Sequence, residues 1–275
     1  MGAVDNASRT RLTLVAIPIS HYCEKARWAL ERAGIDYEEE RHLQGFHHYF
    51  AKRRGGDFTT PVLVFPDGRP AIGQSSGILR WVDEQLGDDQ KLYPDDVASR
   101  VRATEHWLDA TLGPDGRGWL YGEILDDAGL IEKYGLDGIP ANERRVFWGV
   151  FKLFKPYLAA RIRVQGTQAD QQSVRDVFDE IAARLADGRR YLMGDRFTAA
   201  DLTFAALSAA VILPRNYGVE LPPLDSLPAS LRASIEEFRA HPAGEFALRM
   251  FAEERPPAAW LAESAPAAAA SVTNR

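Results

Sequence analysis

The sequence of 275 residues predicts a small α/β domain followed by an all-helical domain, and three observations support this fold class. Residues 12–86 alternate strand-like and helix-like segments in the order β-α-β-α-β-β-α. Residues 87–96 are polar, contain a proline and lack a hydrophobic period, as expected of a linker. In residues 97–252 the apolar side chains recur at helical spacing, so an all-helical domain is expected there.

The composition excludes several classes of partner. The formal net charge is -6 with charges of both signs interspersed, so the chain offers no basic stripe to nucleic acid. No apolar run approaches the ~18 residues that span a bilayer, and residues 1–10 lack the apolar core of a secretory signal. We therefore expect a cytoplasmic protein that binds neither nucleic acid nor membrane, with a flexible N-terminus over residues 1–11. A single cysteine excludes an internal disulfide and any multi-cysteine metal site, and no metal is expected.

The junction between the first strand and the first helix presents polar groups at a helix N-terminus. Residues 12–17 form a β-rich run that Pro18 ends, because proline cannot donate a ladder hydrogen bond. The helix that follows carries Cys23 on its apolar face and ends near Gly34. Unpaired N–H groups and the helix dipole favour an anion at its start, including a thiolate. Ser20 is therefore an ordinary N-cap or a hydroxyl aimed at a bound anion, and Cys23 is a buried thiol or a reactive one.

Further segments complete the pattern of the first domain. Residues 36–43 are predicted to form its second strand, and residues 44–54 an irregular or short helical segment. His47 and His48 would point to different sides of any regular element, so they make a poor metal pair. Residues 61–73 are predicted to form a hairpin around a turn.

The strand that begins this hairpin has a proline at its entrance. Residues 57–65 predict a buried strand, and a cis peptide before Pro61 would expose the main chain of Thr60 at the sheet edge. A helix is expected over residues 74–86, with Ser75 at or near its cap. A second helix N-terminus is thus predicted close to this proline in the sequence.

Helices are predicted throughout the second domain. They cover residues 97–112, 142–165, 172–187, 197–211, 228–240 and 243–252. The first is expected to stop at Gly113-Pro114, and the glycine-rich residues 115–140 are ambiguous. Residues 142–165 mix aromatic residues with Arg and Lys, which we interpret as a core helix with solvated charges, not as a face for nucleic acid or membrane.

The most hydrophobic predicted helix, residues 197–211, is expected at the centre of the helical domain. Thr198 with Asp201 three residues later forms a capping-box-like start, which makes Asp201 a structural residue. Residues 253–275 are rich in proline and alanine and are expected to form a disordered tail.

Four local motifs occur together in a specific order and spacing. They are Ser20-His-Tyr-Cys23 followed by Lys25, Arg27 and Leu30, then Thr60-Pro61, Gln74-Ser75 and Thr198-Ala-Ala-Asp201. Over roughly residues 12–252 this set resembles the cytosolic glutathione S-transferase superfamily, in its serine- and cysteine-type classes. The resemblance implies a thioredoxin-like N-terminal domain, an all-helical C-terminal domain, a homodimer and a role in detoxification, with the class unassigned.

The resemblance also implies glutathione as co-substrate and assigns residues to it. Ser20 would hydrogen-bond the glutathione thiolate and lower its pKa below the free thiol value of ~8.5. The main chain of Thr60, before Pro61, would pair with the cysteinyl backbone as an added strand pairs with a sheet edge. Gln74 and Ser75, at a helix N-terminus, would receive the γ-glutamyl carboxylate.

Two further subsites are expected from the same resemblance. The glycine carboxylate of glutathione needs a cation, for which His47, Lys52 and Arg53 are candidates. A small hydrophobic electrophile would bind between the two domains. Its candidate lining residues are Tyr22, Trp107, Tyr121, Trp148 and Phe151.

Departures from the family pattern leave alternatives open. Ser20-x-x-Cys23 resembles a redox C-x-x-C motif whose first cysteine is replaced, so we expect Cys23 to be a small buried residue. An alternative is a glutathione-dependent thiol transferase or reductase that uses Cys23, and another is a non-catalytic ligand-binding protein of the same fold. The glycine-broken region 113–165 leaves the class and the substrate open.

Overall fold

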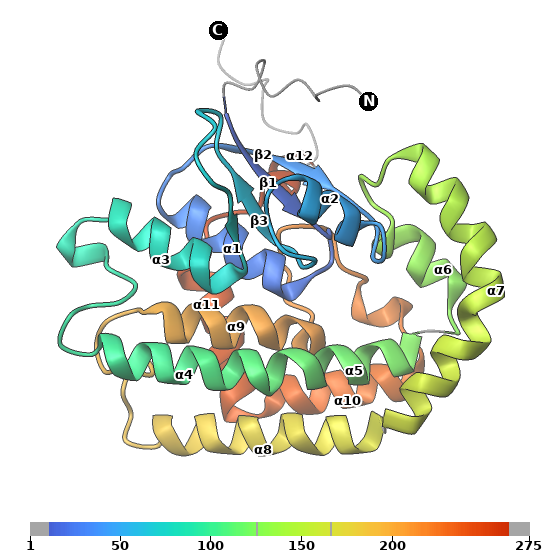
Figure 1. Ribbon diagram of the computed structural model, residues 1–275. Coiled ribbons are helices and arrows are strands. Elements are labelled where there is room, and N and C mark those ends of the chain that lie inside the picture. Colours follow the sequence, from blue (N-terminus) through green and yellow to red (C-terminus); the bar gives the residue numbers. More distant parts are fainter. Residues whose placement is uncertain (1–10, 125, 166, 264–275) are drawn as a thin grey trace, which may run out of the picture.

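The computed structural model describes residues 11–124, 126–165 and 167–263, and it contains the two predicted domains (Figure 1). In the described residues, the first domain has a four-stranded sheet of order β2-β1-β3-β4. Its strands are β1 Leu12–Ala16, β2 Tyr37–Arg41, β3 Val62–Val64 and β4 Ile72–Gly73. Strands β1 and β2 are parallel, whereas the β1–β3 and β3–β4 pairs are antiparallel. The predicted fold class, an α/β domain followed by a helical one, is confirmed.

Helices cover both faces of the sheet. They are α1 His21–Arg32, α2 His47–Arg53 and α3 Ser75–Gln85. Leu14 and Ala16 of β1 face the main core with α1 and α3, whereas Val15 between them packs with Ala51 of α2. Because successive side chains of a strand alternate between faces, a strand covered on both sides must be apolar throughout. This explains the apolar run from Leu14 to Ala16 in β1.

The second domain is helical in all its regular elements among the described residues. Its α-helices are α4 Ala98–Ala110, α5 Leu112–Ile124, α6 Ala128–Leu130, α7 Ala141–Gln165, α8 Thr167–Leu185, α9 Ala199–Ile212, α10 Ala229–Ala240, α11 Pro242–Glu253 and α12 Ala259–Glu263. Short turns of other helix types are η1 Asp88–Gln90, η2 Ile131–Gly135 and η3 Leu224–Ser226.

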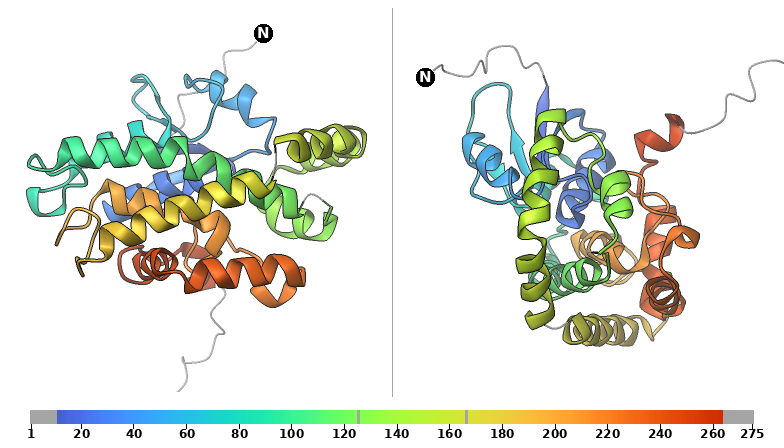
Figure 2. Two further views of the ribbon diagram at one scale, coloured as in Figure 1. Left: turned by 90° about the horizontal axis from the view of Figure 1, so that it is seen from below. Right: turned by 90° about the vertical axis from the view of Figure 1, so that its right-hand side faces the viewer.

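Helix α9 lies at the centre of this domain, as predicted. All its residues are buried, and it packs against α1, α4, α5 and α11 (Figure 2). The predicted capping box is confirmed, because the Thr198 amide donates to the Asp201 carboxylate at 2.8 Å. Asp201 also accepts from the Leu192 amide at 2.7 Å, so its carboxylate holds the entry of α9 in place.

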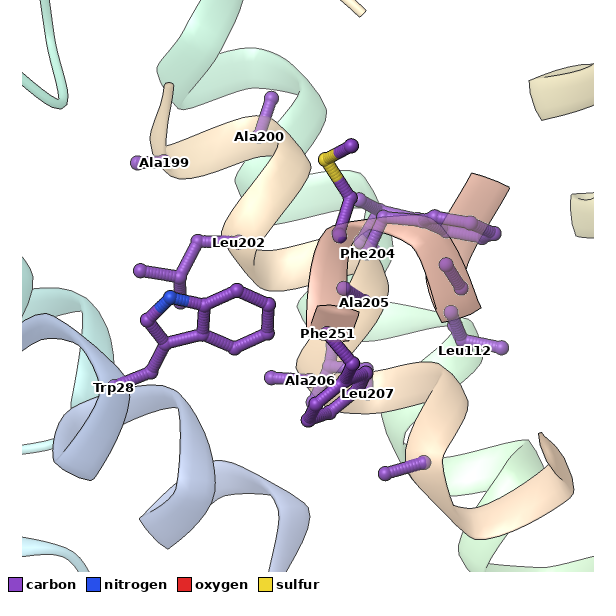
Figure 3. Packing of buried hydrophobic residues seen from close by; sticks show 14 of the residues in the cluster. Trp28, Leu112, Ala199, Ala200, Leu202, Phe204, Ala205, Ala206, Leu207 and Phe251 are labelled. Atoms are coloured by element: carbon purple, nitrogen blue, oxygen red, sulfur yellow. The ribbon is translucent and has the colours of Figure 1, made fainter. Parts of the chain in front are cut away.

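The two domains share one hydrophobic core. Trp28 of α1 points toward α9 and lies with its ring centroid 4.9 Å from that of Phe251 of α11 (Figure 3). Beside it, the buried Arg255 guanidinium pairs with Glu24 of α1 at 2.8 Å and with Glu31. Separating the domains would expose this shared apolar core to water, so the core resists their separation. The walls of any cleft between the domains are therefore held in a fixed relation.

The chain around Gly113-Pro114 differs from the expectation. Helix α4 ends at Ala110, and a second helix, α5, begins at Leu112 and extends to Ile124, into the glycine-rich region. Proline is tolerated in the first turn of a helix because its missing N–H would have no partner there. Pro114 therefore marks the start of α5 and does not exclude a helix.

The C-terminal segment also differs from the expectation. Helix α12 lies within residues 253–275, which were expected to form a disordered tail, and Arg255 in the same segment is 3% exposed. The described fold thus extends beyond 253, while residues 264–275 and the expected flexible residues 1–10 lie outside the described residues. Among the helices of the described part, none combines the length and apolarity needed to cross a membrane.

Candidate functional site

A cleft of about 1260 Å³ lies between the two domains. Three separate segments of the first domain reach it, namely the start of α1 with Ser20, the loop with Thr60 and Pro61, and the start of α3 with Gln74 and Ser75. The opposite wall comes from the helical domain, chiefly from α5, α7 and the end of α9. The structure therefore brings together the polar groups of three segments that are far apart in the sequence.

Ser20 is the N-cap of α1 and also lines the cleft. Its Oγ accepts a long hydrogen bond of 3.4 Å from the Cys23 amide. Among the described residues, no acceptor takes the hydrogen of this hydroxyl, so Ser20 is able to donate toward the cleft. The amides of the first helical turn and the positive end of the helix dipole lie at the same place. Ser20 is thus the N-cap of α1, and it also places a hydroxyl donor at the cleft.

The two aromatic residues after Ser20 have fixed protonation states near neutral pH. Burial, with a smaller effect from the charge of Arg117, lowers the pKa of His21 to about 3, so its ring is neutral. Burial, reinforced by the charge of Asp109, raises the pKa of Tyr22 to about 12. The Tyr22 hydroxyl donates its hydrogen to the Asp109 carbonyl at 2.8 Å, so this hydrogen is not available to a ligand in the cleft.

Cys23 lies in the core. Its side chain is 0% exposed, and it is not among the residues that line the cleft. Burial raises the pKa of the Cys23 thiol, and the nearby Arg27 charge only partly opposes this effect. A buried, protonated thiol is a poor nucleophile, because thiolate is the reactive form.

The Thr60-Pro61 and Gln74-Ser75 segments lie next to each other. The Thr60-Pro61 peptide is cis, as the position of the proline predicted, and the Pro61 carbonyl accepts from the Gln74 amide at 3.0 Å. Gln74 has a φ of 64°, a left-handed conformation that a non-glycine residue adopts at a cost of order 1–3 kcal/mol. This conformation directs the chain into α3, whose first residue, Ser75, is 4% exposed.

Asp109 of α4 supplies a carboxylate beside this segment, and sequence reasoning missed it. Its two oxygens accept from the buried Lys25 ammonium at 3.0 and 2.9 Å, and one accepts from the Ser76 hydroxyl at 2.8 Å. Lys25 also pairs with Glu105 at 2.8 Å. Asp109 remains 22% exposed and lines the cleft, so an acidic group faces the start of α3.

The three candidate cations of the first domain do not supply a fixed positive charge to the cleft. His47 lines it, but burial, with a smaller effect from His48, lowers the pKa of His47 to about 4. Lys52 and Arg53 are exposed on α2 and do not line the cleft. Lys52 lies over the Phe58 ring at 5.4 Å.

The hydrophobic lining differs in part from the expectation. Tyr22, Tyr121 and Phe151 line the cleft, whereas Trp107 and Trp148 do not. Trp107 packs against the main core, and Trp148 packs against the small cluster of Leu43, Leu136 and Ile139. Apolar lining residues that the sequence did not single out include Leu120, Ile124, Leu130, Phe147, Leu213 and Leu221. Periodicity identified these side chains as apolar but not the surface they would face.

The polar residues of the cleft are not arranged as a metal centre. Within the described residues, no group of three or more His, Cys, Asp or Glu side chains is placed to hold a metal ion.

Comparison with protein families supports the two-domain description. The family model described as glutathione S-transferase, N-terminal domain, matches residues 19–85, and the one described as glutathione S-transferase, C-terminal domain, matches residues 164–243. The first match contains Ser20, Thr60 and Gln74. A search of curated protein sequences finds no match to this chain.

Solved structures show the same fold at low sequence identity. A glutathione S-transferase of Ceriporiopsis subvermispora in complex with glutathione has a TM-score of 0.60 and 17% identity, covering 89% of this chain and 98% of that chain. A glutathione transferase of Burkholderia graminis, with two glutathione molecules bound per subunit, has a TM-score of 0.56 and 16% identity, covering 94% and 90%. A theta class glutathione S-transferase of Xanthomonas axonopodis pv. citri with glutathione bound has a TM-score of 0.51 and 20% identity, covering 86% and 97%.

Proposed function

The chain belongs to the glutathione S-transferase superfamily, and on this premise we propose that it is a glutathione transferase acting on a small hydrophobic electrophile. The observation that carries the proposal is the convergence of Ser20, Thr60, Gln74 and Ser75 on one wall of the interdomain cleft. These residues were assigned to glutathione from their motifs alone. The glutathione-bound relatives with the same fold support the ligand.

In the proposed mechanism, Ser20 donates a hydrogen bond to the sulfur of glutathione. The N-terminus of α1 adds a favourable field, and both effects stabilise the thiolate over the thiol. The thiolate attacks an electrophilic carbon, a carbon–sulfur bond forms, and with an aryl halide the halide leaves with its electron pair. Cys23 is not part of this proposal, because its thiol is buried and its pKa is raised.

The apolar wall of the cleft supports a hydrophobic co-substrate. Tyr121 and Phe151 face the cleft from α5 and α7, and the region between these helices contributes Leu130. Burying an apolar ligand against such a surface is favourable in proportion to the area removed from water. The family relationship extends the proposal to a homodimer in the cytoplasm.

The test is conjugation of glutathione to a panel of hydrophobic electrophiles that includes an activated aryl halide, together with calorimetric titration of glutathione. Binding with turnover is the expected result. Binding without turnover across the panel would instead identify a ligand-binding protein of this fold. Absence of glutathione binding would overturn the proposal.

A further inference from the structure

Arg117 of α5 is an exposed cation in the interdomain cleft. Among the described residues that line the cleft, it is the only Lys or Arg. It forms no hydrogen bond or ion pair with any described residue. Two carboxylates share this wall, but Asp115 accepts from the Ser173 hydroxyl and Asp170 is not within ion-pair distance of Arg117. The guanidinium is therefore available to a ligand.

The face of α5 that carries Arg117 spans the cleft opposite the first domain. Gly113, one turn before it, lies against the Tyr22 hydroxyl at the start of α1. Tyr121, one turn after it, donates from its hydroxyl to the side-chain carbonyl of Gln44 at 2.7 Å. Residues four apart share one face of a helix. Arg117 thus lies across from the stretch between the Ser20 end of the site and the loop that precedes α2.

The charge on glutathione identifies the group that this cation would meet. With the site residues as assigned from the motifs, the γ-glutamyl carboxylate binds at the start of α3, at Gln74 and Ser75. The sulfur lies at Ser20. The glycine carboxylate remains, and it needs a cation because burying an unpaired carboxylate is costly.

Within residues 11–86, the described part of the first domain, no Lys or Arg lines the cleft. His47 is neutral at pH 7, since its pKa is lowered to about 4 mainly by burial, and Lys52 and Arg53 lie outside the cleft lining. The charge of Arg117 is felt most at His21, where it is second to burial in lowering the pKa, and it makes a smaller contribution at His47, after burial, His48 and His42.

We propose that Arg117 of the helical domain binds the glycine carboxylate of glutathione, across the cleft from the residues that bind the rest of the tripeptide. This inference rests on the proposed function. It assigns part of the glutathione site to the second domain, so the tripeptide would bridge both domains. A guanidinium suits this role, because it can bind a carboxylate through two parallel hydrogen bonds.

The test uses two ligands and measures their dissociation constants by calorimetry. Glutathione carries the glycine carboxylate, and its glycine ethyl ester lacks that charge. We expect the unaltered protein to bind the ester about 10- to 100-fold more weakly than glutathione, the range for loss of one charge-assisted contact. Arg117→Gln should bind glutathione as weakly as the ester and should no longer discriminate between them. Arg117→Lys should recover part of the discrimination.

Lys52→Gln is the matched control, because it removes a positive charge from α2 outside the cleft lining. It should discriminate between the ligands as the unaltered protein does. The inference would be overturned if Arg117→Gln still bound glutathione more tightly than the ester by the full factor, or if Lys52→Gln lost that preference. In either case, turnover of glutathione would leave the proposed function intact. If the unaltered protein binds neither ligand, the inference and the proposed function both fail.

Discussion

The Cys23 amide donates to the Ser20 hydroxyl oxygen at 3.4 Å, so the two side chains lie within one turn of α1 yet face different surroundings. Ser20 lines the interdomain cleft, whereas Cys23 is 0% exposed in the shared core. The helix start therefore separates the two candidate reactive groups of the sequence, placing the hydroxyl at the cleft and the thiol away from it.

Replacing Ser20 with Ala should lower kcat/KM for an activated aryl halide on the order of 10²-fold, the effect of removing one donor that stabilises developing charge. The pH at which the bound glutathione ionises should rise in the same variant, which ultraviolet difference spectroscopy of the thiolate measures. Cys23→Ala is the control and should keep activity close to that of the unaltered protein. Full activity in Ser20→Ala would remove Ser20 from the mechanism.

The thiol of Cys23 should resist modification in the folded protein. Because the thiol is buried, a reagent cannot reach it, and because its pKa is raised, little of it is thiolate at neutral pH. Labelling should therefore require local opening of the structure. Mass spectrometry after treatment with oxidised glutathione should show no adduct on the native protein. Denatured protein labelled with iodoacetamide provides the positive control. A glutathione adduct on native Cys23 would instead favour the thiol transferase alternative.

Gly113→Ala should destabilise the protein, because an added Cβ would overlap the Tyr22 hydroxyl. Forced overpacking of this kind costs about 1–3 kcal/mol, and it would also disturb the hydrogen bond from Tyr22 to Asp109. Gly149→Ala is the matched control, since an added Cβ at Gly149 in α7 meets nothing within 4 Å. It should gain about 0.5–1 kcal/mol from helix propensity. In chemical denaturation, the free energy of unfolding should fall in Gly113→Ala and rise in Gly149→Ala. Equal changes in the two variants would contradict the packing argument.

Stability should depend on pH through His42, which joins the two domains. His42 is hydrogen-bonded to Glu143 of α7 at 2.8 Å and to Glu40 at 3.1 Å. Burial acts to lower the pKa of His42, but these hydrogen bonds outweigh it, and the pKa is raised. The contribution of His42 to the free energy of unfolding is thus complete below its unfolded pKa of ~6.5. It is lost as pH rises through the raised pKa of the folded protein.

Urea unfolding at pH 6 and pH 9 measures this dependence. The fall in the free energy of unfolding between the two pH values should be smaller in Glu143→Gln than in the unaltered protein. Glu253→Gln, which changes an exposed carboxylate on α11, should leave the fall unchanged. An undiminished fall in Glu143→Gln would exclude this pair as the source.

Much of the fold could be predicted because it depends on short-range interactions. The cis peptide before Pro61 and the capping box of Thr198 and Asp201 are confirmed, and each is set by residues within three positions of one another. The run of β1 and the helical spacing after residue 97 likewise fixed the class of each domain. The Gly113-Pro114 pair predicts the end of a helix, but it lies in the first turn of α5, where proline is tolerated.

The tertiary structure decided which residues line the cleft. The sequence identified Ser20, Thr60 and Gln74 by motif, but it did not place Arg117 or Asp109 at the cleft, and it offered Lys52 and Trp107, which lie elsewhere. Which face of a helix meets a ligand depends on how the helix is rotated against its neighbours. That rotation is set by packing between residues far apart in the chain, such as Gly113 against Tyr22, and a single sequence does not contain such contacts as a local pattern.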